Sequence, residues 1–171
     1  SGTPFRGALY AGLILTPDGP KVLEYNVRFG DPETQSIFPR LEDDAFELFA
    51  SAARGALATT EVRFSSHAAA TVVVAAEGEP GVGARGDVGD GLDAVASMPD
   101  VRVYHAGTRR EGDRIVTDGG RVLGVTGLGP SVVDAVAAAY RAVRKISWRG
   151  MQYRHDIGAS ELLVLSLLAL A

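Results

Sequence analysis

The sequence predicts a mixed α/β chain of the α+β kind, in which strand and helix signals fall into two modules. Residues 8–15 and 68–76 are apolar runs of strand length. Residues 43–54 and 131–146 place apolar side chains at helical spacing. Glycine accounts for 21 of the 171 residues, so many turns are expected between these elements.

The first module begins with a predicted β-hairpin. Residues 8–15 (ALYAGLIL) are typical of a buried strand, and residues 16–20 (TPDGP) carry Pro and Gly in a pattern typical of a turn. A second strand is expected over 21–29. The short loop between the two strands predicts that they pair as a hairpin.

A short helix is predicted after the hairpin. Asp31, Pro32 and Glu33 are typical of a helix start, with Asp31 as N-cap, Pro32 in the first helical position and an acid in the first turn. Pro39 should interrupt this helix, because proline has no backbone N–H to donate.

A longer helix over 43–54 closes the first module, with Gly55 as its C-terminal stop. The composition then changes. We predict a first module over 1–58, a linker over 59–67 and a second module over 68–158.

The second module is predicted to be rich in strands and to close with a helix. Residues 68–76 run without alternation, as in a strand buried on both faces, and residues 77–91, with six glycines, should be a long loop. Ser131 is expected to cap a helix that runs to about 146. The other predicted elements are a short helix and three strands, over 92–97, 101–107, 114–118 and 121–126.

Residues 159–171 are expected to be a divergent or non-native tail. The last ten residues (LLVLSLLALA) are nearly all apolar, but this is about half the length that a membrane span needs. A buried terminal helix or foreign sequence is therefore favoured over membrane contact.

Charge and cysteine content exclude several classes of protein. The chain has 17 Lys and Arg against 21 Asp and Glu, a formal net charge of −4. This acidic balance argues against nucleic-acid or membrane-surface binding, which needs a basic patch. The absence of cysteine excludes a disulfide framework, a thiolate zinc site and a cysteine nucleophile.

Polar side chains line one face of the second predicted strand. Because side chains alternate along a strand, Glu24, Asn26 and Arg28 share a face at steps of ~6.6–6.8 Å, and apolar residues occupy the other face. The oxygens of Glu24 and Asn26 suit Mg²⁺, and the Arg28 guanidinium suits a phosphate or carboxylate. An ordinary amphipathic strand with a solvated face explains the same pattern.

The residues that follow this strand favour an anion site. Gly30 and a predicted helix N-terminus come directly after Arg28, and free backbone N–H groups at such a terminus favour anions. Metal-type oxygens, a guanidinium and an anion-binding turn thus lie within twelve residues. This combination favours phosphoryl transfer or an acyl-phosphate reaction.

These residues also carry a resemblance to a known family. Residues 23–35 (LEYNVRFGDPETQ) closely resemble the signature of the phosphoribosylamine–glycine ligase (glycinamide ribonucleotide synthetase) family of ATP-grasp enzymes, and residues 4–26 resemble the same family. Further similar segments follow in the same order at 104–108 (YHAGT), 119–125 (GGRVLGV) and 150–158 (GMQYRHDIG). The resemblance covers about residues 4–158.

The resemblance implies a fold and a reaction. The fold would be the C-terminal part of an ATP-grasp core, followed by a small β-rich domain with a closing helix, similar to the C-terminal domain of biotin carboxylase. ATP would phosphorylate the glycine carboxylate to a glycyl phosphate. The amine of 5-phosphoribosylamine would then attack it, giving glycinamide ribonucleotide in de novo purine biosynthesis. A cytoplasmic ligase is implied.

The resemblance also assigns roles to residues. Glu24 and Asn26 match the family's ligands for Mg²⁺ (or Mn²⁺) in the ATP site, and Arg28 matches an arginine near the transferred phosphoryl group. Asp31 and Glu33 are candidates for orienting glycine, with helix capping as the alternative.

The family's upstream parts, a substrate domain and a nucleotide-binding subdomain with a Gly-rich loop, have no counterpart in these 171 residues. We therefore expect a fragment that needs the upstream half of the enzyme and is inactive alone. Two alternatives stay open: another carboxylate-activating ATP-grasp enzyme, such as a biotin-carboxylase relative, and a non-catalytic scaffold. His67, His105 and His155 show no metal-ligand spacing, so structural or surface roles are favoured for them.

Overall fold

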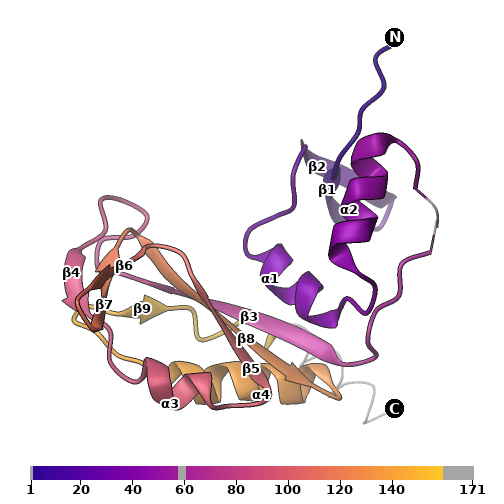
Figure 1. The fold of residues 1–171 in the computed structure, drawn as a ribbon. Coiled ribbons are helices and arrows are strands. Elements are labelled where there is room, and N and C mark those ends of the chain that lie inside the picture. The colour runs from indigo at the N-terminus through magenta and orange to yellow at the C-terminus, as the bar shows by residue number, and fades with distance from the viewer. Residues whose placement is uncertain (1, 58–60, 160–171) are drawn as a thin grey trace, which may run out of the picture. The chain divides into compact units, whose positions relative to one another are not determined.

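The computed structural model describes residues 2–57 and 61–159. The chain divides into two compact units, Ser1–Ser65 and Ser66–Ala171, whose elements are labelled in Figure 1.

The predicted linker over 59–67 stays a prediction, and the apolar segment at 162–171 lies outside the described residues. Within the described residues, no helix combines the length and the apolar character that crossing a bilayer requires.

The first unit contains the predicted hairpin. Strands β1 (Tyr10–Thr16) and β2 (Gly19–Asn26) pair in antiparallel fashion around a tight turn. At this turn the Thr16 hydroxyl donates a hydrogen bond to the carbonyl of Gly19 at 2.7 Å. The register shifts after Gly12, which leaves Leu23 as an extra residue in β2. Strand β2 ends at Asn26, three residues earlier than the sequence predicts.

Short helices follow the hairpin. Helix α1 (Glu33–Ile37) gives way to a 3₁₀ turn, η1 (Phe38–Arg40), at the position where Pro39 was expected to interrupt it. The N-cap of α1 is Pro32, without a side-chain capping bond, so the prediction that Asp31 caps this helix is wrong. The reason is local: the carboxylate of Asp31 accepts a hydrogen bond from the Gln35 amide at 2.8 Å instead.

Helix α2 (Ala45–Arg54) begins two residues later than predicted and ends where predicted. The Asp44 carboxylate accepts from the backbone N–H groups of Phe46 and Glu47, and Gly55 ends the helix in the left-handed conformation at φ +68°. Three aromatic rings of this unit, from Phe29, Phe38 and Phe49, pack against one another with centroids 5.2–5.7 Å apart, although Phe29 and Phe49 remain partly exposed.

The second unit is built on antiparallel sheets. Four strands pair in the order β5-β8-β3-β9, and their bounds are β3 Ala68–Ala75, β5 Val101–His105, β8 Arg121–Gly129 and β9 Gln152–Tyr153. Three more pair in the order β4-β7-β6, with bounds β4 Arg85–Val88, β6 Thr108–Glu111 and β7 Arg114–Asp118.

Three of these strands differ from the sequence prediction. Strand β4 lies inside the segment predicted to be loop, and β6 and β9 are also missing from the prediction. All three strands are short. The pairing partners of β4 and β9 are distant in sequence, and β6 pairs with its neighbour β7 but has the polar sequence TRRE, which gives no apolar strand signal.

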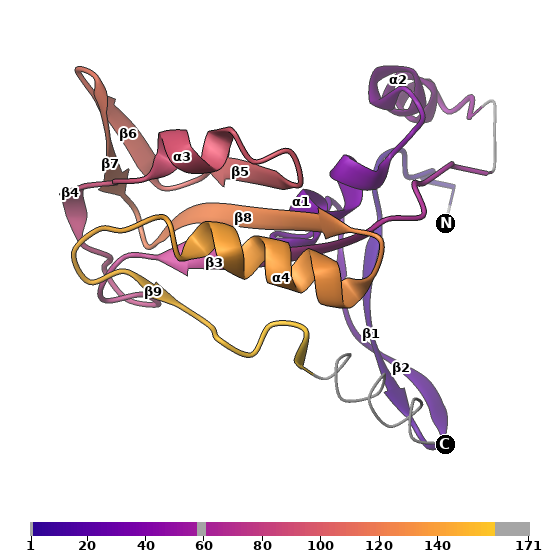
Figure 2. The same ribbon diagram turned by 90° about the horizontal axis from the view of Figure 1, so that it is seen from below.

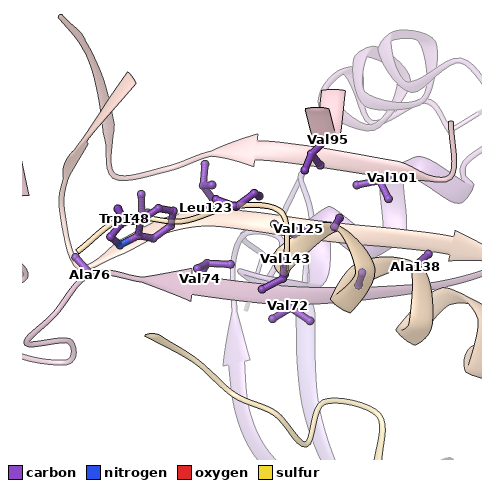
Figure 3. Packing of buried hydrophobic residues seen from close by; sticks show 14 residues of the cluster. Val72, Val74, Ala76, Val95, Val101, Leu123, Val125, Ala138, Val143 and Trp148 are labelled. Atoms are coloured by element: carbon purple, nitrogen blue, oxygen red, sulfur yellow. The ribbon is translucent and has the colours of Figure 1, made fainter. Parts of the chain in front are cut away.

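Two helices cover one face of the four-stranded sheet, as Figures 1 and 2 show: α3 (Leu92–Ala96) beside β5, and α4 (Val132–Val143) across β3 and β8. Ser131 caps α4 as predicted, with its hydroxyl accepting from the Asp134 N–H at 3.2 Å. Figure 3 shows the apolar core between α4 and the sheet, with Val72, Val74, Leu123 and Val125 among its buried members.

Candidate functional site

Glu24 and Asn26 lie side by side on β2. The Asn26 side chain donates a hydrogen bond from Nδ2 to Oε1 of Glu24 at 3.0 Å. Across the hairpin Asn26 pairs with Tyr10, and Glu24 pairs with Gly12. A Cβ at Gly12 would lie 3.1 Å from Cγ of Glu24, so the glycine leaves room for this side chain. Alternation along the strand correctly predicts that the two oxygen donors share a face.

Tyr10 joins these residues. Its hydroxyl donates to Oε1 of Glu33 at 3.4 Å. The negative charge of Glu33, with smaller contributions from burial, this hydrogen bond and the charge of Glu24, raises the pKa of Tyr10 above its ordinary value. Sequence reasoning missed Tyr10, because only the register of the hairpin brings it next to Asn26.

Arg28 is near the same group but is not on the strand. The structure places it two residues beyond the end of β2, where its Nη1 donates to the carbonyl of Phe29 at 3.1 Å. Its positive charge lowers the pKa of Tyr10 and so opposes Glu33 and Glu24. The prediction that Arg28 shares a strand face with Glu24 and Asn26 is therefore wrong in its geometry, because β2 ends before Arg28.

The turn between β2 and α1 positions two further carboxylates. Gly30 is buried, and both the backbone N–H and the hydroxyl of Thr34 donate to its carbonyl. A Cβ at Gly30 would lie 2.3 Å from Oε2 of Glu33, so only glycine leaves space for this carboxylate. Asp31 is held by Gln35, as described above.

The donor set can be compared with the needs of a divalent cation. Among the described residues, no three His, Asp or Glu side chains converge as a metal-binding group. In the same part of the chain, Oε2 of Glu24 and Oδ1 of Asn26 have no hydrogen-bond partner. Two oxygen donors fit Mg²⁺, which usually takes one or two protein ligands and fills its other positions with water and phosphate oxygens. They do not fit a site made of protein ligands alone.

Comparison with known proteins first identifies the class. Residues 1–34 match the family model described as "Phosphoribosylglycinamide synthetase, ATP-grasp (A) domain". This segment contains Glu24, Asn26, Arg28 and Asp31. The candidate site is therefore formed by a piece of an ATP-grasp protein.

The second match identifies the family. Residues 69–160, more than half of the chain, match the model described as "Phosphoribosylglycinamide synthetase, C domain". The chain belongs to the phosphoribosylglycinamide synthetase family.

Named relatives agree with this assignment. A phosphoribosylamine–glycine ligase of Streptomyces coelicolor is 51% identical over 161 residues, which are 92% of this chain and 39% of the relative. One of Rhodopirellula baltica is 48% identical over 158 residues, which are 92% of this chain and 36% of the relative. The chain thus spans less than two fifths of the length of these two relatives.

Solved structures confirm the predicted fold class. The crystal structure of phosphoribosylamine–glycine ligase from Thermotoga maritima superposes with a TM-score of 0.71 at 34% identity, over 87% of this chain and 36% of that one. N5-carboxyaminoimidazole ribonucleotide synthetase from the same organism gives a TM-score of 0.55 at 18% identity, over 84% of this chain and 37% of that one. This second likeness shows the fold alone.

Proposed function

We propose that this chain is the C-terminal portion of a phosphoribosylamine–glycine ligase. The whole enzyme would use ATP to join glycine to 5-phosphoribosylamine through a glycyl phosphate, as a cytoplasmic step of de novo purine biosynthesis. The observation that carries the proposal is the 51% identity, along 92% of the chain, to a relative with this name. The ATP-grasp match over the residues of the candidate site supports it.

The chain's own residues would contribute at the phosphoryl end of the reaction. Glu24 and Asn26 would hold a divalent cation, Mg²⁺ or Mn²⁺, through Oε2 and Oδ1. When bound, this cation would neutralise negative charge on the phosphate oxygens of ATP. The Arg28 guanidinium would donate to the oxygens of the transferred group as charge develops there.

Asp31 would act on the second substrate. Its carboxylate, held by the Gln35 amide at 2.8 Å, would attract the ammonium group of glycine and so orient the glycine carboxylate toward the phosphoryl group. In this chemistry neither Asp31 nor Glu24 needs to act as a covalent nucleophile.

The proposal includes an upstream partner portion, and the first unit supports it. A hairpin of two strands is marginally stable in isolation. This one exposes large apolar side chains from both strands, among them Leu15 (83% exposed) and Leu23 (68%). We therefore expect the upstream portion of the longer enzyme to cover these side chains, and the 171-residue chain alone to be inactive.

The test combines the two portions. The chain is mixed with the separately expressed upstream portion, and ADP release that depends on both glycine and 5-phosphoribosylamine is measured. We expect activity only when both portions are present, and a loss of about a hundredfold or more with Glu24→Ala. Glu47→Ala removes an exposed carboxylate of α2 and should leave the activity unchanged.

Each contrary result has a distinct meaning. Activity with bicarbonate in place of glycine would favour another carboxylate-activating ATP-grasp reaction. No activity from two folded portions that bind each other would favour a non-catalytic scaffold. Equal activity of the Glu24→Ala and Glu47→Ala variants would remove Glu24 from the proposed cation site.

A further inference from the structure

The second unit contains a pocket that the proposed reaction does not use. It has a volume of about 370 Å³ and lies among α3, β5 and the β6–β7 hairpin. Its floor is apolar, formed by Leu92, Val95, Val103 and Ile115. The volume lies in the range of small-molecule sites, and an apolar floor with a few polar groups is typical of them.

The rim of this pocket carries uncompensated positive charge. Arg110 has no ion-pair partner within the described ranges, 2–57 and 61–159. Its neighbour Arg109 differs, because it is paired with Glu111 and with Asp118, the latter at 3.6 Å. Arg110 pairs with Ile115 across the hairpin, so it shares a face with the apolar floor.

The other polar residues that line the pocket leave its net charge positive. Arg102 donates only to the neutral backbone carbonyls of Pro99 and Val101, at 3.0 and 2.8 Å. The ring of His105 uses Nδ1 for a hydrogen bond with the Thr108 hydroxyl at 3.0 Å, which orients its Nε2 atom. Asp93 supplies the one carboxylate among the lining residues, against two guanidinium groups.

We propose that this pocket binds a small organic anion, with its apolar or aromatic body on the floor and its phosphate or carboxylate group at Arg110. An apolar body explains the floor, which an inorganic ion would not fill. An anionic group explains the unpaired guanidinium, which can bind such a group with two parallel hydrogen bonds. The site is formed by the second unit alone, so its test needs neither ATP nor the upstream portion.

The experiment is a titration of the ¹⁵N-labelled 171-residue chain, followed by amide chemical shifts. The probes are phenyl phosphate, benzoate, phenol and inorganic phosphate. We expect saturable shifts at Val103, Arg110 and Ile115 with phenyl phosphate or benzoate. Phenol lacks the anionic group, and inorganic phosphate lacks the apolar body. Each should bind at least about tenfold more weakly than phenyl phosphate. The ratio of phenyl phosphate to benzoate affinity then tells which anionic group the pocket prefers.

A matched pair of variants tests the guanidinium. Arg110→Gln should weaken phenyl phosphate binding about tenfold. Arg114→Gln removes an exposed arginine of the same hairpin that does not line the pocket, and it should leave the affinity unchanged. The proposal is overturned if no probe gives saturable shifts at the pocket, if phenol binds as tightly as phenyl phosphate, or if both variants weaken binding equally. The comparison of probes holds even if one variant folds poorly, which the same spectra would reveal.

Discussion

Gly30 controls the electrostatics of the candidate site through the space it leaves. Its missing Cβ would fall 2.3 Å from Oε2 of Glu33, and Glu33 is the main cause of the raised pKa of Tyr10. We expect Gly30→Ala to displace the Glu33 carboxylate and to lower the pKa of Tyr10 toward its ordinary value. A ¹³C NMR titration of labelled tyrosine rings measures this.

Glu33→Gln tests the same cause by removing the charge itself. It removes the negative charge without changing the shape of the side chain, so it should lower the pKa of Tyr10 in the same direction. An unchanged pKa of Tyr10 in both variants would show that Glu33 does not act on it.

The pairing of Asp43 with Arg63 predicts an acid-sensitive contribution to stability. The Asp43 carboxylate accepts from the backbone N–H of Arg63 at 2.7 Å and from its guanidinium at 2.8 Å. The backbone bond first, and the side-chain bond second, lower the pKa of Asp43. A lowered pKa means that the contribution is present above the unfolded-state value of about 3.9 and is lost as the pH falls through the folded-state value.

We therefore expect Asp43→Asn to destabilise the first unit near neutral pH and to lose this effect between about pH 5 and pH 2. Urea unfolding of both proteins at several pH values, each with the upstream portion added, checks it. Asp18→Asn, at an exposed turn position 3.8 Å from Lys21, should have little effect throughout. A difference between wild type and Asp43→Asn that stays constant over the acid range would contradict the prediction.

These residues also show how far local patterns reach. Alternation along β2 correctly predicts that Glu24 and Asn26 share a face, because side-chain direction depends only on neighbouring residues. It fails for Arg28, because the length of β2 depends on pairing with β1. The roles proposed for Glu24, Asn26, Arg28 and Asp31 stay predictions until the activity test.

At the scale of elements, helix α4 and strand β8 pack closely against each other at one glycine, Gly127. A Cβ at Gly127 would lie 2.1 Å from the carbonyl oxygen of Ala135 and 2.4 Å from the amide nitrogen of Ala139. Both neighbours are backbone atoms of a helix, so neither can rotate away. We expect Gly127→Ala to lower the free energy of unfolding by about 3 kcal/mol, measured by denaturant unfolding of the second unit.

Gly112→Ala is the matched control in the β6–β7 turn. Its φ is +60° and nothing lies within 4 Å of its added Cβ, so it should cost only about 1–2 kcal/mol from backbone strain. Equal losses in the two variants would contradict the close approach of α4 to β8.

The predicted elements fall into two groups for a physical reason. The amphipathic helices α2 and α4 and the apolar strands β3 and β8 were predicted, because burial repeats along their own sequence. The strands β4, β6 and β9 were missed. Strands β4 and β9 form only by pairing with partners that are remote in sequence. Strand β6 pairs with the adjacent β7, but its polar sequence TRRE gives no apolar strand signal.

Across the whole molecule, the two units differ in how completely each buries its apolar residues. The second unit has a contiguous core that includes Val72, Leu123, Val143 and Trp148. In the first unit neither α1 nor α2 has a buried residue, and the hairpin exposes apolar side chains. We expect residues 66–159 to fold alone with a cooperative thermal transition, and residues 2–65 to lack one.

Circular dichroism and NMR of the two separate pieces check this expectation. Cooperative unfolding of 2–65 alone, or a disordered spectrum from 66–159, would contradict it. Addition of the upstream portion should restore cooperative unfolding to the first unit if that portion covers the hairpin.

Local sequence determines which segments of this protein become the long helices and apolar strands, and it places Glu24 and Asn26 on one face. These properties depend on caps, alternation and helical spacing, which involve residues a few positions apart. The motif at 23–35 likewise points to the family, which the comparisons confirm. Tertiary pairing determines the rest: Tyr10 beside Asn26, the end of β2 before Arg28, Gly127 beneath α4, and Arg110 over an apolar floor. Each of these features forms where segments that are separate in sequence contact each other. Their alignment is set by packing and by hydrogen bonds between the segments.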